Sequence, residues 1–154
     1  MKKWFVLPVA LFSFSAFGQA SIAYYPWQDY FLTVSTNPTR AVWLDFRLQT
    51  NTLLGQFNTA VVPLINVKRA PTYQIYLGPG VEFSAVNAAL GNEFLQNASF
   101  HVGTRISPFA VAPNFQVAFE LAPTVNVNNE SGVLRSRLGF AYIFRKRKTA
   151  AVNP

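Results

Sequence analysis

Alternation of apolar and polar side chains with a period of two is the feature that most constrains the fold of this chain. Between Ala41 and Gln49, apolar side chains fill every second position and Asp45 and Arg47 lie between them. Because successive side chains of a strand point to opposite faces, the segment has one apolar and one charged face. Similar segments are Tyr30–Ser35, Tyr73–Ser84, Phe100–Ile106, Phe115–Leu121 and Leu138–Phe144. The pattern predicts an all-β protein.

The first twenty residues have the organisation of a secretory signal peptide. Lys2 and Lys3 form a positive n-region, Trp4 to Phe14 form an apolar run, and small residues precede position 21. We predict cleavage after Ala20, with Gly18 as the second choice, so residues 1–20 are removed and the protein is exported. The chain contains no Cys, which excludes attachment of lipid to a cysteine, disulfides and thiolate metal sites.

The distribution of side-chain sizes predicts which face of the strands lies inside. The chain has 15 Phe, 6 Tyr and 3 Trp but only 12% charged residues, more aromatic surface than one small soluble core hides. The apolar faces carry large side chains, whereas the polar faces contain the small residues Gly78, Gly80, Gly103, Ala118, Gly139 and Ala141. Small inner residues suit a crowded interior, so we expect a transmembrane barrel whose apolar faces contact lipid. A soluble barrel would bury the apolar faces instead.

The last strand segment, from Arg137 to Phe144, carries the most specific motif. It resembles the C-terminal insertion signal of bacterial outer-membrane β-barrels, and the positions that match are Arg137, Gly139, Tyr142 and Phe144. The resemblance implies an outer-membrane location, contact with the barrel-assembly machinery during insertion, and a final aromatic residue at the periplasmic interface. The chain departs from the pattern by continuing through the basic tail 145–154.

The sequence shows seven strand segments, whereas single-chain bacterial barrels have an even number of strands. A seventh segment, Phe57–Val67, is apolar on both faces, and we expect a bend or bulge at Pro63. Ser21–Trp27 is interpreted as too short for a strand and contains Pro26. Either one segment hides two strands, the first segment is not a full crossing, or a partner chain completes an edge. We predict an antiparallel up-and-down barrel of eight strands over residues 21–144, because about 134 mature residues match the OmpA/OmpX size class.

The connections between these segments differ in length. The longest are Ala85–Asn97 and Pro123–Gly132. A short helix over Ala85–Leu95 is the alternative to a loop in the first of them. With Phe144 at the periplasmic end, both connections lie on the extracellular side. Candidates for the aromatic belts at the lipid interface are Tyr24, Tyr25, Trp27, Tyr142 and Phe144.

The few charges of the mature chain fall mainly on the inner face and in the tail. The inner charges are Asp45, Arg47, Glu82, Arg105, Glu120, Arg135 and Arg137. Unpaired charges are costly in a narrow interior, so we predict a salt-bridge network that fastens the barrel; a binding or ion pathway is the alternative. The basic run Arg145–Lys148 is expected to be solvated or to contact anionic lipid rather than nucleic acid.

Catalytic and metal-binding motifs are weak. The chain has one His, His101, which makes no metal-ligand set. His101 lacks a Ser two positions later, where small lipid A deacylase barrels carry one, although Ser99, Ser107 and Glu120 could supply parts of a catalytic group. We therefore expect no enzyme activity and no cofactor.

Three functional hypotheses follow from these features. The first is a non-enzymatic outer-membrane barrel with a side-chain-filled interior that contacts lipid and serves as a structural or accessory subunit, with another outer-membrane protein as a candidate partner. The second is an outer-membrane lipid-modifying enzyme that depends on His101. The third is a soluble periplasmic barrel that holds an apolar ligand between its aromatic faces.

Overall fold

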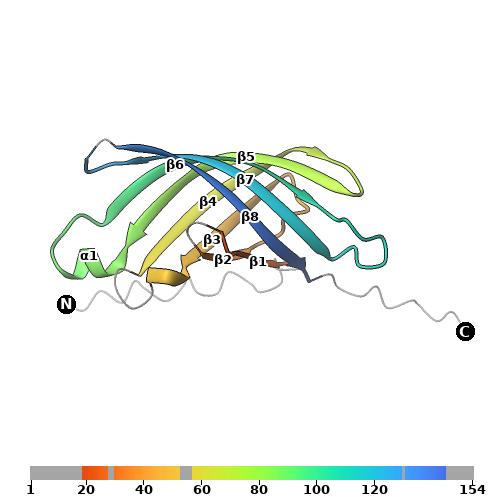
Figure 1. Ribbon diagram of the computed structural model, residues 1–154, viewed down its shortest axis with the longest axis horizontal. Helices are drawn as coiled ribbons and strands as arrows, with labels where there is room; N and C mark the ends of the chain where they lie inside the picture. Colours follow the sequence, from red (N-terminus) through yellow and green to blue (C-terminus); the bar gives the residue numbers. More distant parts are fainter. Residues whose placement is uncertain (1–18, 28–29, 53–56, 130, 145–154) are drawn as a thin grey trace, which may run out of the picture.

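The strands close into a single antiparallel barrel in the computed structural model, which describes residues 19–27, 30–52, 57–129 and 131–144 (Figure 1). The strands are β1 (Ser21–Tyr25), β2 (Phe31–Ser35), β3 (Val42–Gln49), β4 (Asn58–Arg69), β5 (Tyr73–Ser84), β6 (Leu95–Ile106), β7 (Phe115–Asn126) and β8 (Gly132–Ile143). Each strand pairs with its neighbours in the sequence, and β1 pairs with β8. The predicted all-β, up-and-down barrel of eight strands is confirmed.

Strand β1 corrects the interpretation of Ser21–Trp27 as too short to be a strand. One edge of β1 pairs with β2, from Ser21 opposite Ser35 to Tyr25 opposite Phe31. The other edge pairs with β8, from Ser21 opposite Ile143 to Tyr24 opposite Phe140. A strand of five residues is held here because both of its edges are paired, and Pro26 follows its last residue instead of interrupting it.

Several element boundaries also differ from those predicted. Strand β6 starts at Leu95 rather than Phe100, and β7 continues to Asn126. The short helix given as an alternative to a loop is present as α1 (Ala85–Ala89), with the Ser84 hydroxyl accepting a hydrogen bond from the Asn87 backbone N–H. A 3₁₀ turn, η3, covers Thr50–Thr52. No helix in the described ranges is long and apolar enough to cross a bilayer.

The bulge predicted at Pro63 lies elsewhere. Pro63 sits in the β3–β4 ladder directly opposite Leu44, without a change of register. On the β5 side, the pairing of β4 is interrupted between Val61 and Ile65, around Pro63, but the register shifts only between Asn66 and Lys68. Pro63 is exposed on the outer face, so its ring causes no crowding inside the barrel.

The polar faces of the strands point into the barrel and the apolar faces point outward. In β3, Trp43, Asp45 and Arg47 are at most 2% exposed, whereas Val42 and Phe46 are 60% and 45% exposed. The same alternation runs through the other long strands, whose outward side chains include Ile65, Ile75, Val81, Phe100, Val102, Phe119, Leu121, Leu138 and Phe140. The prediction that the polar face fills the interior is confirmed for β3 and for β5 to β8, whereas β4 turns Ala60, Val62 and Leu64 inward.

One candidate of the aromatic belt is inside the barrel. Tyr25 is fully buried, whereas its neighbour Tyr24 is 41% exposed. Adjacent strand residues face opposite sides, so only one of this pair can point outward. Tyr25 belongs to an inner apolar cluster with Ala23, Phe31, Ala118 and Ala141.

Small inner residues make room for large rings. A methyl group added to Gly103 would lie 2.5 Å from the ring of Tyr76, and one added to Gly139 would lie 2.6 Å from the ring of Tyr25. Tyr76 packs with Trp43, Val62 and Leu64 in a second inner cluster. The interior is therefore filled by side chains, as the glycines on the polar faces predicted.

The barrel has two distinct ends. The end that we call the terminal end holds the β2–β3, β4–β5 and β6–β7 connections, the start of β1 and the last residue of β8. The opposite end holds η3, α1 and the β7–β8 turn, at the left in Figure 1. Strands β1 and β2 have five residues each and β4 to β8 have 12, so the barrel wall is lower on the β1–β2 side.

Candidate functional site

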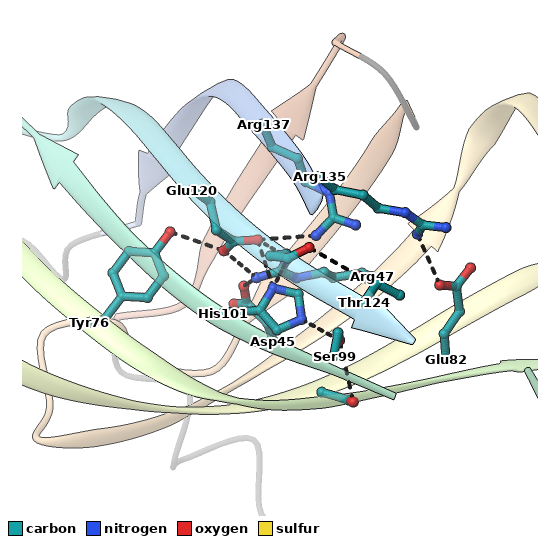
Figure 2. Close-up of polar contacts among 12 residues, drawn as sticks. Asp45, Arg47, Tyr76, Glu82, Ser99, His101, Glu120, Thr124, Arg135 and Arg137 are labelled. Atoms are coloured by element: carbon teal, nitrogen blue, oxygen red, sulfur yellow. Dashed lines mark hydrogen bonds and ion pairs between the residues drawn. The ribbon is translucent and has the colours of Figure 1, made fainter. Parts of the chain in front are cut away.

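Glu120 of β7 is the centre of a polar cluster in the middle of the barrel (Figure 2). Arg47 of β3 reaches across the interior and donates to both carboxylate oxygens, at 2.6 and 2.8 Å. Arg137, directly opposite Glu120 on β8, donates to Oε1 at 3.2 Å. The Tyr76 hydroxyl donates to Oε2 at 3.2 Å. These four side chains are at most 3% exposed, so Glu120 joins three strands around the interior.

Asp45 of β3 is the second buried carboxylate of the cluster. Arg47 donates to its Oδ2 at 3.0 Å, and the Arg105 guanidinium lies 3.7 Å from the same oxygen. The hydroxyl of Ser35, the register partner of Asp45 on β2, donates to Oδ1 at 2.5 Å. Arg105 also lies 4.5 Å from the ring centroid of Trp43, where the negative face of the ring attracts the cation.

The remaining predicted charges form a pair closer to the opposite end. Arg135 of β8 lies 3.3 Å from the Glu82 carboxylate of β5, and the Asn97 amide donates to the same oxygen at 3.0 Å. The Arg135 side chain is 21% exposed and that of Glu82 7% exposed. All seven charges named from the sequence therefore take part in ion pairs, five of them in the central cluster and Glu82 and Arg135 closer to the opposite end.

The central cluster pairs three cations with two carboxylates. It contains the guanidinium groups of Arg47, Arg105 and Arg137 and the carboxylates of Asp45 and Glu120. Isolated charges at such depth would be strongly unfavourable, whereas paired and hydrogen-bonded charges are tolerated. The arrangement links β3, β6, β7 and β8 through polar contacts and fills the space that a pore would need.

His101 of β6 joins this cluster in an arrangement that resembles a catalytic triad. Its Nδ1 lies 2.8 Å from Glu120 Oε1, and its Nε2 lies 2.8 Å from the Ser99 hydroxyl. A hydroxyl, an imidazole and a carboxylate in this order can activate the hydroxyl as a nucleophile. The hydroxyl of Ser99 also lies 3.3 Å from the Gly80 carbonyl oxygen, which offers it a purely structural partner.

Sequence reasoning identified Ser99, Ser107 and Glu120 as possible companions of His101, and the structure brings only two of them to it. Ser99 and His101 lie two positions apart and therefore share the inner face of β6. The Ser107 hydroxyl instead contacts Gln116 and the Pro113 carbonyl oxygen at the terminal end. The alternation gives the shared face, but the distance to Glu120 depends on the pairing of β6 with β7.

The sequence reasoning missed several partners of the cluster. Tyr76, Ser35 and Trp43 contact its charged groups and are all at most 2% exposed. Their positions on the inner faces were readable from the period-two pattern, but they carry no charge and were not singled out. Buried hydroxyls and rings add contacts to the charged groups here.

The residues of the C-terminal motif occupy both faces of β8. Arg137 and Gly139 point inward, whereas Tyr142 and Phe144 are 45% and 55% exposed at the terminal end. The rings of Tyr142 and Phe144 pack edge to face, with centroids 5.2 Å apart. Residues 1–18 of the predicted signal peptide and the whole basic tail, residues 145–154, lie outside the described residues.

Among the described residues, no group of three His, Cys, Asp or Glu side chains is arranged to hold a metal ion. The inner surface is thus a salt-bridged polar cluster that contains a Ser–His–Glu chain. Comparison of the whole chain with protein-family models, curated proteins and solved structures gave no match.

Proposed function

We propose that this protein is a small outer-membrane β-barrel that acts as a structural or accessory subunit of the cell envelope, without enzyme activity. The observation that carries the proposal is the inversion of the usual pattern of burial. Arg47, Arg105 and Glu120 are at most 1% exposed inside the barrel, whereas the large apolar side chains of the long strands are exposed outside. A lipid bilayer is the environment in which this distribution is favourable.

The strand lengths support a membrane crossing. Strands β4 to β8 have 12 residues each, which corresponds to about 40 Å of extended chain and, at a tilt of about 45°, to about 28 Å along the membrane normal. The apolar band of such barrels is about 25 Å tall. The five residues of β1 and of β2 reach only about 12 Å by the same arithmetic, so the wall on that side does not match the full band.

The outward aromatic residues support an interfacial position of the terminal end. Tyr142 and Phe144 are exposed there, on either side of Ile143, the last residue of β8. Amphipathic aromatic rings favour the boundary between lipid and water. In the proposed orientation this end faces the periplasm, and the barrel-assembly machinery would recognise the same strand during insertion.

The soluble alternative fits the geometry less well. A soluble carrier of an apolar ligand would surround its ligand with aromatic side chains. In the described strands, Phe46, Phe100 and Phe119 are among the side chains exposed on the outer face. The inner rings of Trp43 and Tyr76 pack against Arg105 of the ion-pair cluster instead of lining an apolar cavity. The outward placement of the aromatic rings therefore supports contact with lipid.

Fractionation of cells that express the full chain tests the proposed location. We expect the protein to sediment with outer membranes, to resist extraction with alkaline carbonate, and to migrate faster on gels before heating than after heating, because a closed barrel binds less detergent than the unfolded chain. Affinity isolation from the same membranes would then identify partner subunits. Recovery as a carbonate-soluble monomer would contradict the proposal.

A second candidate function, acyl hydrolysis, is favoured by one observation: the two contacts of 2.8 Å that join Ser99, His101 and Glu120. In such a reaction the Ser99 oxygen attacks an ester carbonyl, His101 takes the serine proton and returns it to the departing alcohol, and water then releases the acid. Glu120 would orient the imidazole. The carboxylate is already shared with Arg47 and Arg137, which fits a structural role equally.

Labelling with a fluorophosphonate probe separates the two roles of this serine. If Ser99 is a nucleophile, the folded protein in detergent reacts with the probe, and Ser99→Ala abolishes labelling while the matched variant Ser107→Ala retains it. If the protein has no enzyme activity, as we propose first, neither the unaltered protein nor the two variants react with the probe. Stoichiometric labelling that depends on Ser99 would replace the non-enzymatic function with the hydrolytic one.

A further inference from the structure

A polar cavity opens at the terminal end of the barrel, away from the central charge cluster. Its volume is about 450 Å³, and the polar side chains that line it include Thr39, Arg69, Tyr73, Gln74, Ser107 and Gln116. These residues come from the β2–β3 turn, the end of β4, the start of β5, the β6–β7 connection and the start of β7. The volume accommodates a small organic ligand, because ligand pockets start at about 300 Å³.

Two amide side chains line this cavity with hydrogen-bonding atoms that have no partner among the described residues. Gln74 and Gln116 are each only 6% exposed. The Gln74 Nε2 donor and the Gln116 Oε1 acceptor make no hydrogen bond within the described part of the protein. The other amide atom of Gln116, Nε2, donates to Ser107 Oγ at 3.3 Å. Buried amides gain stability when a partner is supplied. Both atoms are shielded from solvent in the barrel, so a ligand in the cavity reaches them when these two lining side chains rotate toward it.

The charge around the cavity is positive. The Arg69 guanidinium stands at the rim, where its Nη1 donates to the Thr39 carbonyl oxygen at 2.9 Å. That bond uses one of the five N–H donors of a guanidinium. The Lys68 ammonium lies 5.6 Å from the ring centroid of Tyr73 beside it. Of the described residues that line the cavity, none is Asp or Glu, so an anionic group is favoured at the rim.

We propose that this cavity binds a phosphate ester that carries free hydroxyl groups. The phosphate pairs with Arg69 at the rim, the Gln74 amide donates to a ligand oxygen, and the Gln116 carbonyl accepts from a ligand hydroxyl. The guanidinium fork suits phosphate oxygens, and the deeper amides supply both a donor and an acceptor for the polyol part.

The same chemistry can come from two sources at a membrane. One is the glycerol phosphate headgroup of an anionic phospholipid and the other is a soluble polyol phosphate. The headgroup source rests on the proposed location in the outer membrane, whereas binding of the soluble compound needs only the folded barrel. The test below separates these cases.

Titration of the full-length protein in phosphatidylcholine nanodiscs with glycerol 1-phosphate tests the site. We expect saturable binding by calorimetry, with shifts of the side-chain amide resonances of Gln74 and Gln116 in NMR spectra. Glycerol alone should bind at least about tenfold more weakly, because it lacks the charge that Arg69 pairs with. Absence of saturable binding at 10 mM ligand, meaning a cavity that holds solvent only, would overturn the proposal.

Variants identify the contacts. Arg69→Gln, Gln74→Leu and Gln116→Leu should each raise the dissociation constant by about tenfold or more, since each removes one hydrogen-bonding group of the site. Arg40→Gln is the matched control, because Arg40 is an exposed cation of the same end that does not line the cavity. If Arg40→Gln weakens binding of glycerol 1-phosphate as much as Arg69→Gln does, the ligand is held by the overall positive charge of this end, and the proposed site is wrong. If a leucine variant fails to fold, the shifts of the Gln74 and Gln116 side-chain amide resonances in the unaltered protein still show whether the ligand contacts these two residues.

Nanodiscs that contain phosphatidylglycerol distinguish the source of the ligand. If the headgroup occupies the cavity, added glycerol 1-phosphate no longer binds and the two amide resonances are already shifted. If the natural ligand is soluble, glycerol 1-phosphate binds equally in both kinds of nanodisc. Both outcomes support the phosphate site, whereas failure of membrane fractionation would remove only the headgroup source.

Discussion

Arg47 illustrates how single residues hold this interior together. Its guanidinium contacts Glu120 on the far wall and Asp45 on its own strand, at 2.6 to 3.0 Å. The side chain is 1% exposed, so water does not replace these contacts when they are lost. Removal of one partner of a buried ion pair leaves an uncompensated charge, and this penalty exceeds the net value of the pair itself.

We expect Arg47→Ala to lower the free energy of unfolding by about 3–5 kcal/mol, because it leaves Glu120 and Asp45 short of a cation. Urea unfolding in lipid vesicles, followed by heat-modifiable gel mobility, measures the change. The exposed Arg40→Ala should change stability by less than about 0.5 kcal/mol. Equal stability of Arg47→Ala and the unaltered protein would contradict a structural role for the cluster.

At the scale of the elements, β1 decides whether the barrel is closed. It is one of the two shortest strands, and its pairing with β8 covers only residues Ser21 to Tyr24. Its side chains alternate between the inner cluster of Tyr25 and the outward positions Ile22 and Tyr24. A strand of this length contributes little by itself, and its stability comes from its two neighbours.

An engineered disulfide checks this closure. Ile22 and Tyr142 are direct register partners on the outer face, and paired strand residues have Cα atoms about 4.5–5.5 Å apart, within the range of a disulfide. The chain has no Cys, so Ile22→Cys with Tyr142→Cys should form one cross-link under oxidation, visible by gel mobility without reductant. Ile22→Cys with Phe140→Cys, a diagonal pair, should cross-link poorly. Efficient cross-linking of the diagonal pair alone would show a different register.

At the scale of the whole molecule, the filled interior limits what the barrel can transport. The ion pairs and the rings of Trp43 and Tyr76 occupy the middle of the barrel, while polar space is found at the terminal end. Barrels of eight strands have room for side chains or one small ligand but not for an aqueous channel. Because the barrel is this narrow, inward side chains close its centre, and open space is left where they do not meet, at the terminal end.

We therefore expect no steady ion conductance from the purified protein in planar lipid bilayers. The central cluster blocks the path, and partial opening would require several buried ion pairs to break together. The single-channel current is the measurement, with an outer-membrane porin of larger diameter as the positive control. Long-lived open steps at neutral pH would contradict a filled interior and favour the ion pathway.

The candidate site was only partly predictable from the chain. The period-two pattern placed Asp45, Arg47 and Glu120 on inner faces, because alternation is a local property of a strand. It did not give the partners within each pair. Arg47 and Glu120 belong to strands far apart in the sequence, and their contact depends on the diameter and register of the closed barrel.

The sequence by itself determined the all-β fold and the separation of apolar and charged side chains onto opposite faces of a strand, since these depend only on neighbouring residues along the chain. The tertiary structure decided that Ser21–Tyr25 closes the barrel, that His101 lies between Ser99 and Glu120, and that Gln74 and Gln116 line one cavity. These features depend on the register between paired strands. Closure of the eight strands sets this register between neighbouring strands, and no single segment of the sequence contains that information.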